Sequence, residues 1–203
     1  MSIIDDIVQL EWQAFDKVDN EGGRASCQND FGTFNIMRKS QFLAWDTATL
    51  MSYRNDLQTA ARLGRNLVQE KYARMMASTA PEEYAGFAHL LPPLNTWQQR
   101  TIERIVETQL GWREAFAREY PRLSDQARAI RTEEDTAGTT SFETYLRGEL
   151  GTYSEETLAA YARMVDEYEA EERNLTCETM AHTAKLYGYD GLQAAEDKLA
   201  EHA

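Results

Sequence analysis

The chain has 203 residues, of which 42% are hydrophobic and 10% aromatic, and its formal net charge is −13. This composition is typical of a globular protein with enough apolar side chains to form a core. The negative charge argues against nucleic acid as a partner, because its phosphates would be repelled. The apolar stretches are far shorter than the roughly 20 residues that cross a bilayer, so we expect no membrane association.

The start of the chain and its cysteines indicate a compartment. Residues Met1 to Asp6 carry acids where an export signal would carry basic residues and then an apolar run. We therefore expect a cytoplasmic protein. Cys27 and Cys177 are too few for a disulfide framework, and we interpret both as free thiols.

In the first half of the chain, residues that begin and end helices follow one another at regular intervals. Asp46 can cap a helix that runs to about Leu63, and Gly64 can end it in a left-handed turn. Asn66 begins the next helix. Pro81 has the position typical of the first helical residue, which predicts a short helix after it.

The second half continues the pattern after a break at 92–93. Thr96 begins a long amphipathic run that reaches about Tyr120. Ser154 and Asn174 can cap two further helices, the second of which ends near Gly188. No stretch alternates with the period of a strand, so the prediction is an all-α fold.

Comparison of the chain with itself indicates a repeat. A shift of 108 residues aligns Thr33–Met75 with Ser141–Thr183 without a gap, and nine of the 43 positions are identical. The identities include Arg65-Asn66-Leu67, a hinge between helices that recurs at 173–175. Amphipathic hairpins can resemble each other by chance, but a shared hinge lies outside the helical periodicity. We predict a helical bundle built from two degenerate tandem copies of a helix-hairpin unit.

These signals predict four segments within one compact domain. Residues 1–80 form the first helical unit, and 81–95 form a linker with a short helix. Residues 96–190 form the second unit, and 191–203 form a C-terminal helix or tail.

The two aligned segments differ in charge. Thr33–Met75 has seven bases and three acids, whereas Ser141–Thr183 has three bases and ten acids. Opposite charges could let the copies dock on each other or on a second molecule, which would allow a homodimer. A more solvated acidic face of the second copy would explain the difference equally well.

A Gly-Gly-Arg loop follows the first predicted helix. Paired glycines allow a close approach of backbone to an anion, and Arg24 could clamp it, but a plain connector explains the loop as well. Cys27 could be a nucleophile if a nearby arginine lowered its pKa, although a buried inert thiol is the simpler interpretation. The Glu-x-x-His pairs of di-metal bundles are absent, so we expect no metal.

Several polar residues of the first copy have lost their counterparts. Arg38, Lys71 and Arg74 have no basic partner in the aligned second copy. Such asymmetry makes them candidates for a function that the second copy lacks. Glu70 matches Glu178 near a helix start, which also fits a structural role.

Four runs carry a resemblance to a known family: Asn20 to Gln28, Met37 to Phe42, Glu70 to Met76 and Ser141 to Leu150. In these runs the chain resembles an uncharacterised bacterial family, domain of unknown function number 4125. The resemblance implies no reaction and no ligand. It implies that some members look like the helical partner of a nucleotidyltransferase-like domain, a role that a separate protein would have to complete here. It also directs attention to Arg38, Gln41, Glu70, Arg74 and Glu149.

The first functional hypothesis is a site for a small anionic metabolite in a cleft between the two halves. The candidates for acid–base or nucleophilic chemistry are Glu11, Glu70, Glu149 and Cys27. The candidates for ligand contact are Glu21, Arg24, Arg38, Gln41, Trp45, Lys71, Tyr72, Arg74 and Tyr145. The alternative is a non-catalytic module that binds another protein. The sequence leaves the substrate, the cofactor and the question of catalysis undetermined.

Overall fold

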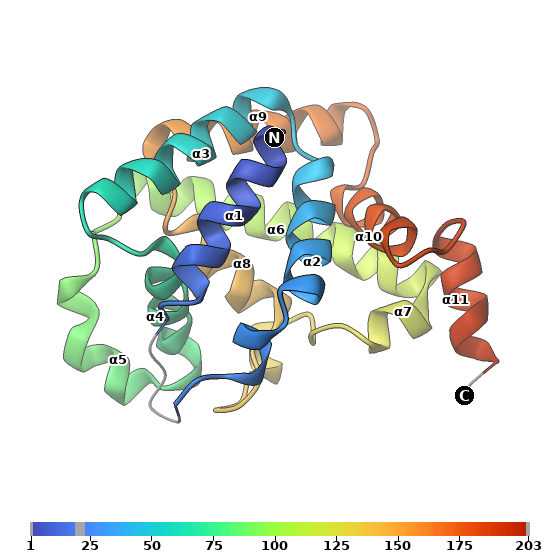
Figure 1. Ribbon diagram of the computed structural model, residues 1–203, viewed down its shortest axis with the longest axis horizontal. Helices are drawn as coiled ribbons and strands as arrows, with labels where there is room; N and C mark the ends of the chain where they lie inside the picture. The colour runs from blue at the N-terminus through green and yellow to red at the C-terminus, as the bar shows by residue number, and fades with distance from the viewer. Residues whose placement is uncertain (1, 19–22, 202–203) are drawn as a thin grey trace.

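The computed structural model describes residues 2–18 and 23–201, and within them the chain forms helices and no strand (Figure 1). The predicted all-α fold is confirmed. The α-helices are α1 Ile3–Phe15, α2 Phe31–Leu43, α3 Thr47–Arg62, α4 Leu67–Thr79, α5 Pro81–Phe87, α6 Thr96–Glu119, α7 Pro121–Asp125, α8 Phe142–Leu150, α9 Glu155–Ala170, α10 Leu175–Leu186 and α11 Leu192–Ala200.

The helices begin where the capping residues predict. The side chains of Asp46, Asn66, Ser154 and Asn174 each accept a hydrogen bond from an N–H group in the first turn of α3, α4, α9 and α10. These bonds satisfy donors that would otherwise lack a partner at a helix start. Gly64 follows α3 with a φ of 71°, in the left-handed region that glycine adopts without strain.

Two asparagines, 108 positions apart, make the same pair of contacts. Asn66 caps α4 and donates from its side chain to the carbonyl oxygen of Ala14, at the end of α1. Asn174 caps α10 and donates to the carbonyl oxygen of Trp112, within α6. These matching hydrogen bonds pair Ala14 of α1 with Trp112 of α6, which lies 98 residues later in the chain. Helices α3 and α9 both have 16 residues, and α9 begins 108 residues after α3.

The two halves interlock. Helix α2 packs against α10, and α4 packs against α8, so each half covers helices of the other. Helix α3 also packs against α9. Helix α6 crosses the centre of the view in Figure 1, whereas α5 lies at one end and α11 at the other, beside α7 and α10. One apolar core contains residues of α1, α2, α3, α6, α8 and α9.

Candidate functional site

Four buried charged side chains meet where the halves touch. They are Glu11 of α1, Arg38 of α2, Lys71 of α4 and Glu149 of α8, and each residue is at most 6% exposed. We call these four residues the buried ion cluster. Charges are costly to bury unless they are paired and hydrogen-bonded, so the contacts of this cluster decide whether it is stable.

Arg38 is the centre of the cluster. Its Nε and Nη2 donate to the two carboxylate oxygens of Glu11, at 2.6 Å each. Its Nη2 and Nη1 also donate to Glu149, at 3.1 and 3.3 Å. A further bond of 2.7 Å runs from Nη1 to Oε1 of Gln41. The planar guanidinium therefore links helices from both halves, as a bidentate ion pair does well.

Lys71 joins the cluster from the other side. Its Nζ donates to the hydroxyl of Tyr145 at 2.7 Å, and lies 3.4 Å from Oε2 of Glu149. It also lies 4.3 Å from the centre of the Tyr145 ring. Helix α8 comes this close to α4 because Gly148 has no side chain: a Cβ there would lie 3.1 Å from the backbone oxygen of Lys71.

Two tyrosines complete the hydrogen bonds of the carboxylates. Tyr53 of α3 donates to Oε1 of Glu11 at 2.6 Å, and Tyr153 donates to Oε1 of Glu149 at 3.1 Å. Burial and the neighbouring carboxylates raise the pKa of both tyrosines well above the ordinary value, so both hydroxyls keep their protons.

The pKa values of three cluster residues, Arg38, Lys71 and Glu149, are shifted toward their charged forms. Burial alone would raise the pKa of Glu149, but the charges of Arg38 and Lys71 and the hydrogen bonds outweigh it and lower the pKa to about 2. The carboxylates likewise outweigh burial and raise the pKa of Arg38. For Lys71, Tyr145 and Glu149 raise the pKa against burial. Acid–base chemistry at neutral pH needs a carboxylate with a raised pKa, and the pKa of Glu149 is lowered instead.

The buried ion cluster lies on the wall of a cavity of about 1240 Å³, lined by helices of both halves. Gln41, Trp45, Tyr72, Tyr145 and the exposed Cys27 line the same cavity. Much of the remaining wall is apolar, including Phe15, Phe34, Val68, Phe142, Leu146, Leu175, Met180 and Leu199. Nine of the predicted site residues are thus brought to one cavity.

Three predicted site residues lie elsewhere, and the first is Glu70. Its carboxylate pairs with Arg65, at 2.6 and 2.8 Å, and not with any group of the cavity. Arg173 and Glu178 form the matching pair, at 2.7 and 2.8 Å, at the start of α10. Both carboxylates lie at a helix start, where a negative charge is favourable, and Glu70 is therefore not brought to the cavity with the other candidates.

Arg24 and Arg74 also serve the scaffold. Arg24 donates to the backbone oxygens of Asp16 and Gln28 and to the side chains of Asp16 and Asn29, so it closes its own loop. Arg74 donates to the backbone oxygen of Pro92 at 2.6 Å. Neither lines the cavity. Glu21 lies outside the described residues.

Sequence reasoning missed two residues of α6, Gln109 and Arg113, which are both buried and both line the cavity. Gln109 donates to the hydroxyl of Tyr161 at 3.0 Å, as Tyr53 donates to Glu11. Comparison of the chain with itself could have related Gln109 of α6 to Glu11 of α1, but the alignment at a shift of 108 residues begins at Thr33 and excludes α1. A separate offset of 98 residues would have matched Glu11 with Gln109.

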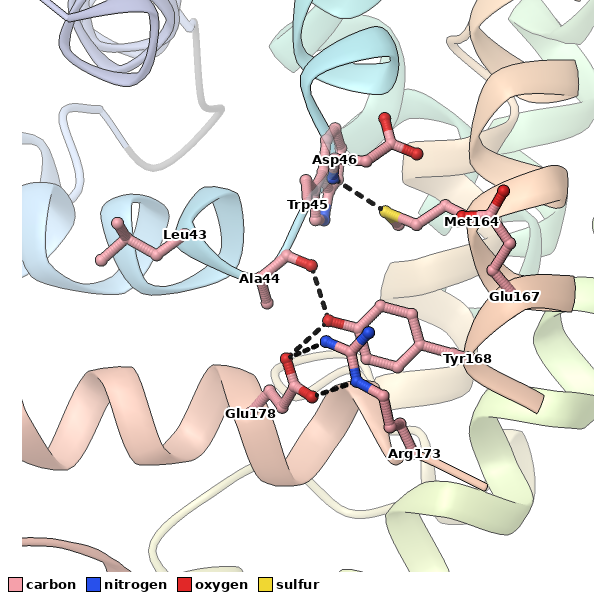
Figure 2. A pocket seen from close by; sticks show the side chains of 9 residues that line it. All are labelled: Leu43, Ala44, Trp45, Asp46, Met164, Glu167, Tyr168, Arg173 and Glu178. Carbon is pink, nitrogen blue, oxygen red and sulfur yellow. Dashed lines mark hydrogen bonds and ion pairs between the residues drawn. The ribbon is translucent and has the colours of Figure 1, made fainter. Parts of the chain in front are cut away.

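In a second hollow, of about 200 Å³, polar groups of the lining bond one another (Figure 2). The hydroxyl of Tyr168 lies 2.8 Å from the backbone oxygen of Ala44 and 2.7 Å from Glu178. The guanidinium of Arg173 lies beside the same carboxylate, as Figure 2 shows. These groups satisfy one another and tie α2, α9 and α10 together, so we assign this hollow to the scaffold.

Across 2–18 and 23–201, no group of three or more His, Cys, Asp or Glu side chains is placed to hold a metal ion. In that part of the chain, no helix has both the length and the apolar character to cross a membrane.

The structure defines an all-α protein with a cavity between helices of its two halves and a buried ion cluster on the wall of that cavity. The chain belongs to the family described as "Protein of unknown function (DUF4125)", whose model matches residues 1–197. The resemblance seen in the sequence is therefore confirmed. No curated protein and no solved structure matches the chain.

Proposed function

We propose that this protein binds a small anionic molecule in the cavity between its two helical halves. The observation that carries the proposal is the convergence of Arg38, Lys71 and Glu149, from three helices of both halves, on one cavity wall. Ligand sites are concave and mostly apolar, with a few convergent polar groups, and this cavity has that composition.

The charge of the wall supports an anion. Of the described residues that are both buried and on the wall, three are cations and two are carboxylates: Arg38, Lys71 and Arg113 against Glu11 and Glu149. These five buried groups therefore carry one positive charge in excess, although the whole chain has a net charge of −13. A local positive potential in a partly desolvated cavity attracts anions.

We further propose that residues 1–80 and 96–190 are copies of one ancestral unit. The matching contacts of Asn66 and Asn174 support this proposal, as do the matching pairs Arg65–Glu70 and Arg173–Glu178. Duplication would place the cavity near the axis that relates the copies, where substitutions in one copy alone can create an asymmetric site.

The proposal concerns binding in the cytoplasm and assigns no reaction. A carboxylate whose pKa is lowered to about 2 is a weak base at neutral pH, so Glu149 supports a role in holding Arg38 and Lys71 in place. The hydroxyl of Tyr145 and the thiol of Cys27 are among the groups with nucleophilic atoms that line the cavity outside the buried ion cluster.

The experiment is a thermal-unfolding screen of the full chain with acetate, octanoate, malonate, benzoate and inorganic phosphate. A ligand at 100 times its Kd stabilises the folded state by about 2.7 kcal/mol, which gives a clear increase in Tm. The variant Thr179→Trp places a large ring in the cavity wall and should abolish the increase. If none of these anions stabilises the protein, the proposal fails, and binding to another protein becomes the better hypothesis.

A further inference from the structure

Arg113 differs from the other buried cations of the cavity. It lies on α6, is 4% exposed and lines the cavity. Within residues 2–18 and 23–201 it makes no hydrogen bond and no ion pair, and its guanidinium carbon lies 5.4 Å from the centre of the Phe116 ring. Burial lowers the pKa of Arg113, and no carboxylate in the described part of the chain counteracts the shift.

The cations of the buried ion cluster are already neutralised. Arg38 holds Glu11 and Glu149, and Lys71 lies beside Glu149, so two cations face two carboxylates. An anion that approached Arg38 would have to displace a bidentate carboxylate. An anion that approached Arg113 would displace none. Among the buried charged side chains of the wall, the one positive charge in excess is therefore that of Arg113.

Arginine keeps its charge even when it is buried, because its pKa is too high for it to lose a proton. A buried cation without a counter-charge is unfavourable, and a perturbed charged group in a cleft is a candidate for a functional site. At the position of α1 that corresponds to Arg113 by the asparagine contacts, the chain has Phe15. The cation is thus a feature of one half only.

The surroundings of Arg113 suit a carboxylate with an apolar body. The planar guanidinium offers two parallel N–H groups, which match the two oxygens of a carboxylate. Gln109, one turn earlier on α6, and three threonines of α10 supply polar groups on the same cavity wall: Thr176, Thr179 and Thr183. Next to them the wall is apolar, with Leu175 and Met180 on α10 and Leu199 on α11.

We propose that Arg113 anchors the ligand and that the ligand is an amphipathic monoanion, a single carboxylate on an apolar body. One unpaired cation neutralises one negative charge, and the apolar wall accepts the remainder of the molecule. This inference rests on the proposed function and adds to it the anchoring residue and the chemical class.

The test is isothermal titration of the full chain with octanoate and, separately, with octan-1-ol, which has the same chain and no charge. Arg113→Met keeps the length and apolar volume of the side chain and removes the charge. We expect it to weaken octanoate binding at least about tenfold, as the loss of a charge-assisted bidentate contact does, and to leave octan-1-ol binding unchanged. Arg113→Lys should restore part of the octanoate affinity, because it restores the charge without the planar fork.

The control is Arg104→Met, which removes an exposed arginine of the same helix that pairs with Asp166 on the surface. It should leave both titrations unchanged. If Arg113→Met binds octanoate as tightly as the unaltered chain, or loses octanoate and octan-1-ol to the same extent, Arg113 is not the anchor. If the unaltered chain binds acetate or phosphate in the screen above but not octanoate, the ligand class is wrong while the proposed function stands.

Discussion

Gln41 donates a hydrogen bond of 3.0 Å to Glu149, and the two residues occupy equivalent positions in the aligned segments, 108 residues apart. An amide faces a carboxylate across the junction of the halves. Two carboxylates at this distance would repel each other, and one would be forced to take up a proton. The amide of Gln41 thus forms a donor–acceptor pair with Glu149 that two glutamates could not form.

The two buried arginines should respond in opposite ways to the same substitution. Arg38→Met leaves Glu11 and Glu149 buried without their common cation and should lower the free energy of unfolding by about 3–5 kcal/mol. Arg113→Met removes a cation that has no partner among the described residues and should be neutral or stabilising. Urea unfolding measures both. Equal losses would contradict the contrast between a paired and an unpaired cation.

Lowering the pH should show how much Glu149 contributes to the free energy of unfolding. Its pKa is about 2 in the folded protein against an ordinary value of 4.5, so the folded state binds fewer protons than the unfolded state between these values. The stabilisation is complete above about pH 5 and is lost as the pH falls toward 2.

The matching variant is Glu149→Gln. It should be less stable than the unaltered chain at pH 6, and the difference in unfolding free energy should shrink as the pH falls to 3, because Glu149 then loses its advantage. The pKa of Asp5 is also lowered to about 2, but Asp5 is present in both proteins and contributes equally to their unfolding free energies, so it does not affect the difference. A difference that stays constant from pH 6 to pH 3 would show that Glu149 does not titrate as described.

Two equivalent tyrosines should differ in the cost of losing a hydroxyl. Tyr53 bonds the carboxylate of Glu11, whereas Tyr161 accepts a bond from the neutral amide of Gln109. Hydrogen bonds to charged groups contribute about 1.5–3 kcal/mol, and those between neutral groups about 0.5–1.5 kcal/mol. Tyr53→Phe should therefore destabilise the protein more than Tyr161→Phe in chemical unfolding, and the reverse order would contradict the assigned partners.

A glycine comparison tests how closely α8 approaches α4. A Cβ at Gly148 would lie 2.8 Å from Cγ of Met75 and 3.1 Å from the backbone oxygen of Lys71, so Gly148→Ala should cost about 1–3 kcal/mol. Gly111 of α6 has open space around it, and Gly111→Ala should instead stabilise the helix by about 0.5–1 kcal/mol. If both variants are stabilised, Gly148 does not set the approach of these helices.

Much of the fold could be predicted from local signals. Asp46, Asn66, Ser154 and Asn174 cap helices in the structure because a cap needs only a side chain and its own first turn. The interlocking of α2 with α10 and of α4 with α8 could not be predicted this way, because it depends on contacts between helices that lie far apart along the chain.

Only part of the site could be predicted, because the sequence does not show which distant residues come together. Arg38 is a candidate because it has no basic counterpart in the aligned segment, and Gln41 and Glu149 are candidates because they lie in the runs that carry the family resemblance. Glu70 drew attention too, but its partner is Arg65, only five residues away, and the sequence alone does not tell a local pair from a long-range one. Arg113 gave no signal because the alignment did not reach α6, and its importance rests on the missing counter-charge.

The most direct measurement is a crystal structure of the full chain grown with octanoate. The account predicts density for the ligand inside the cavity, with its carboxylate oxygens within hydrogen-bond distance of the Arg113 guanidinium and its chain against the apolar wall. An octanoate bound outside the cavity, or one whose carboxylate displaces Glu11 from Arg38, would contradict it.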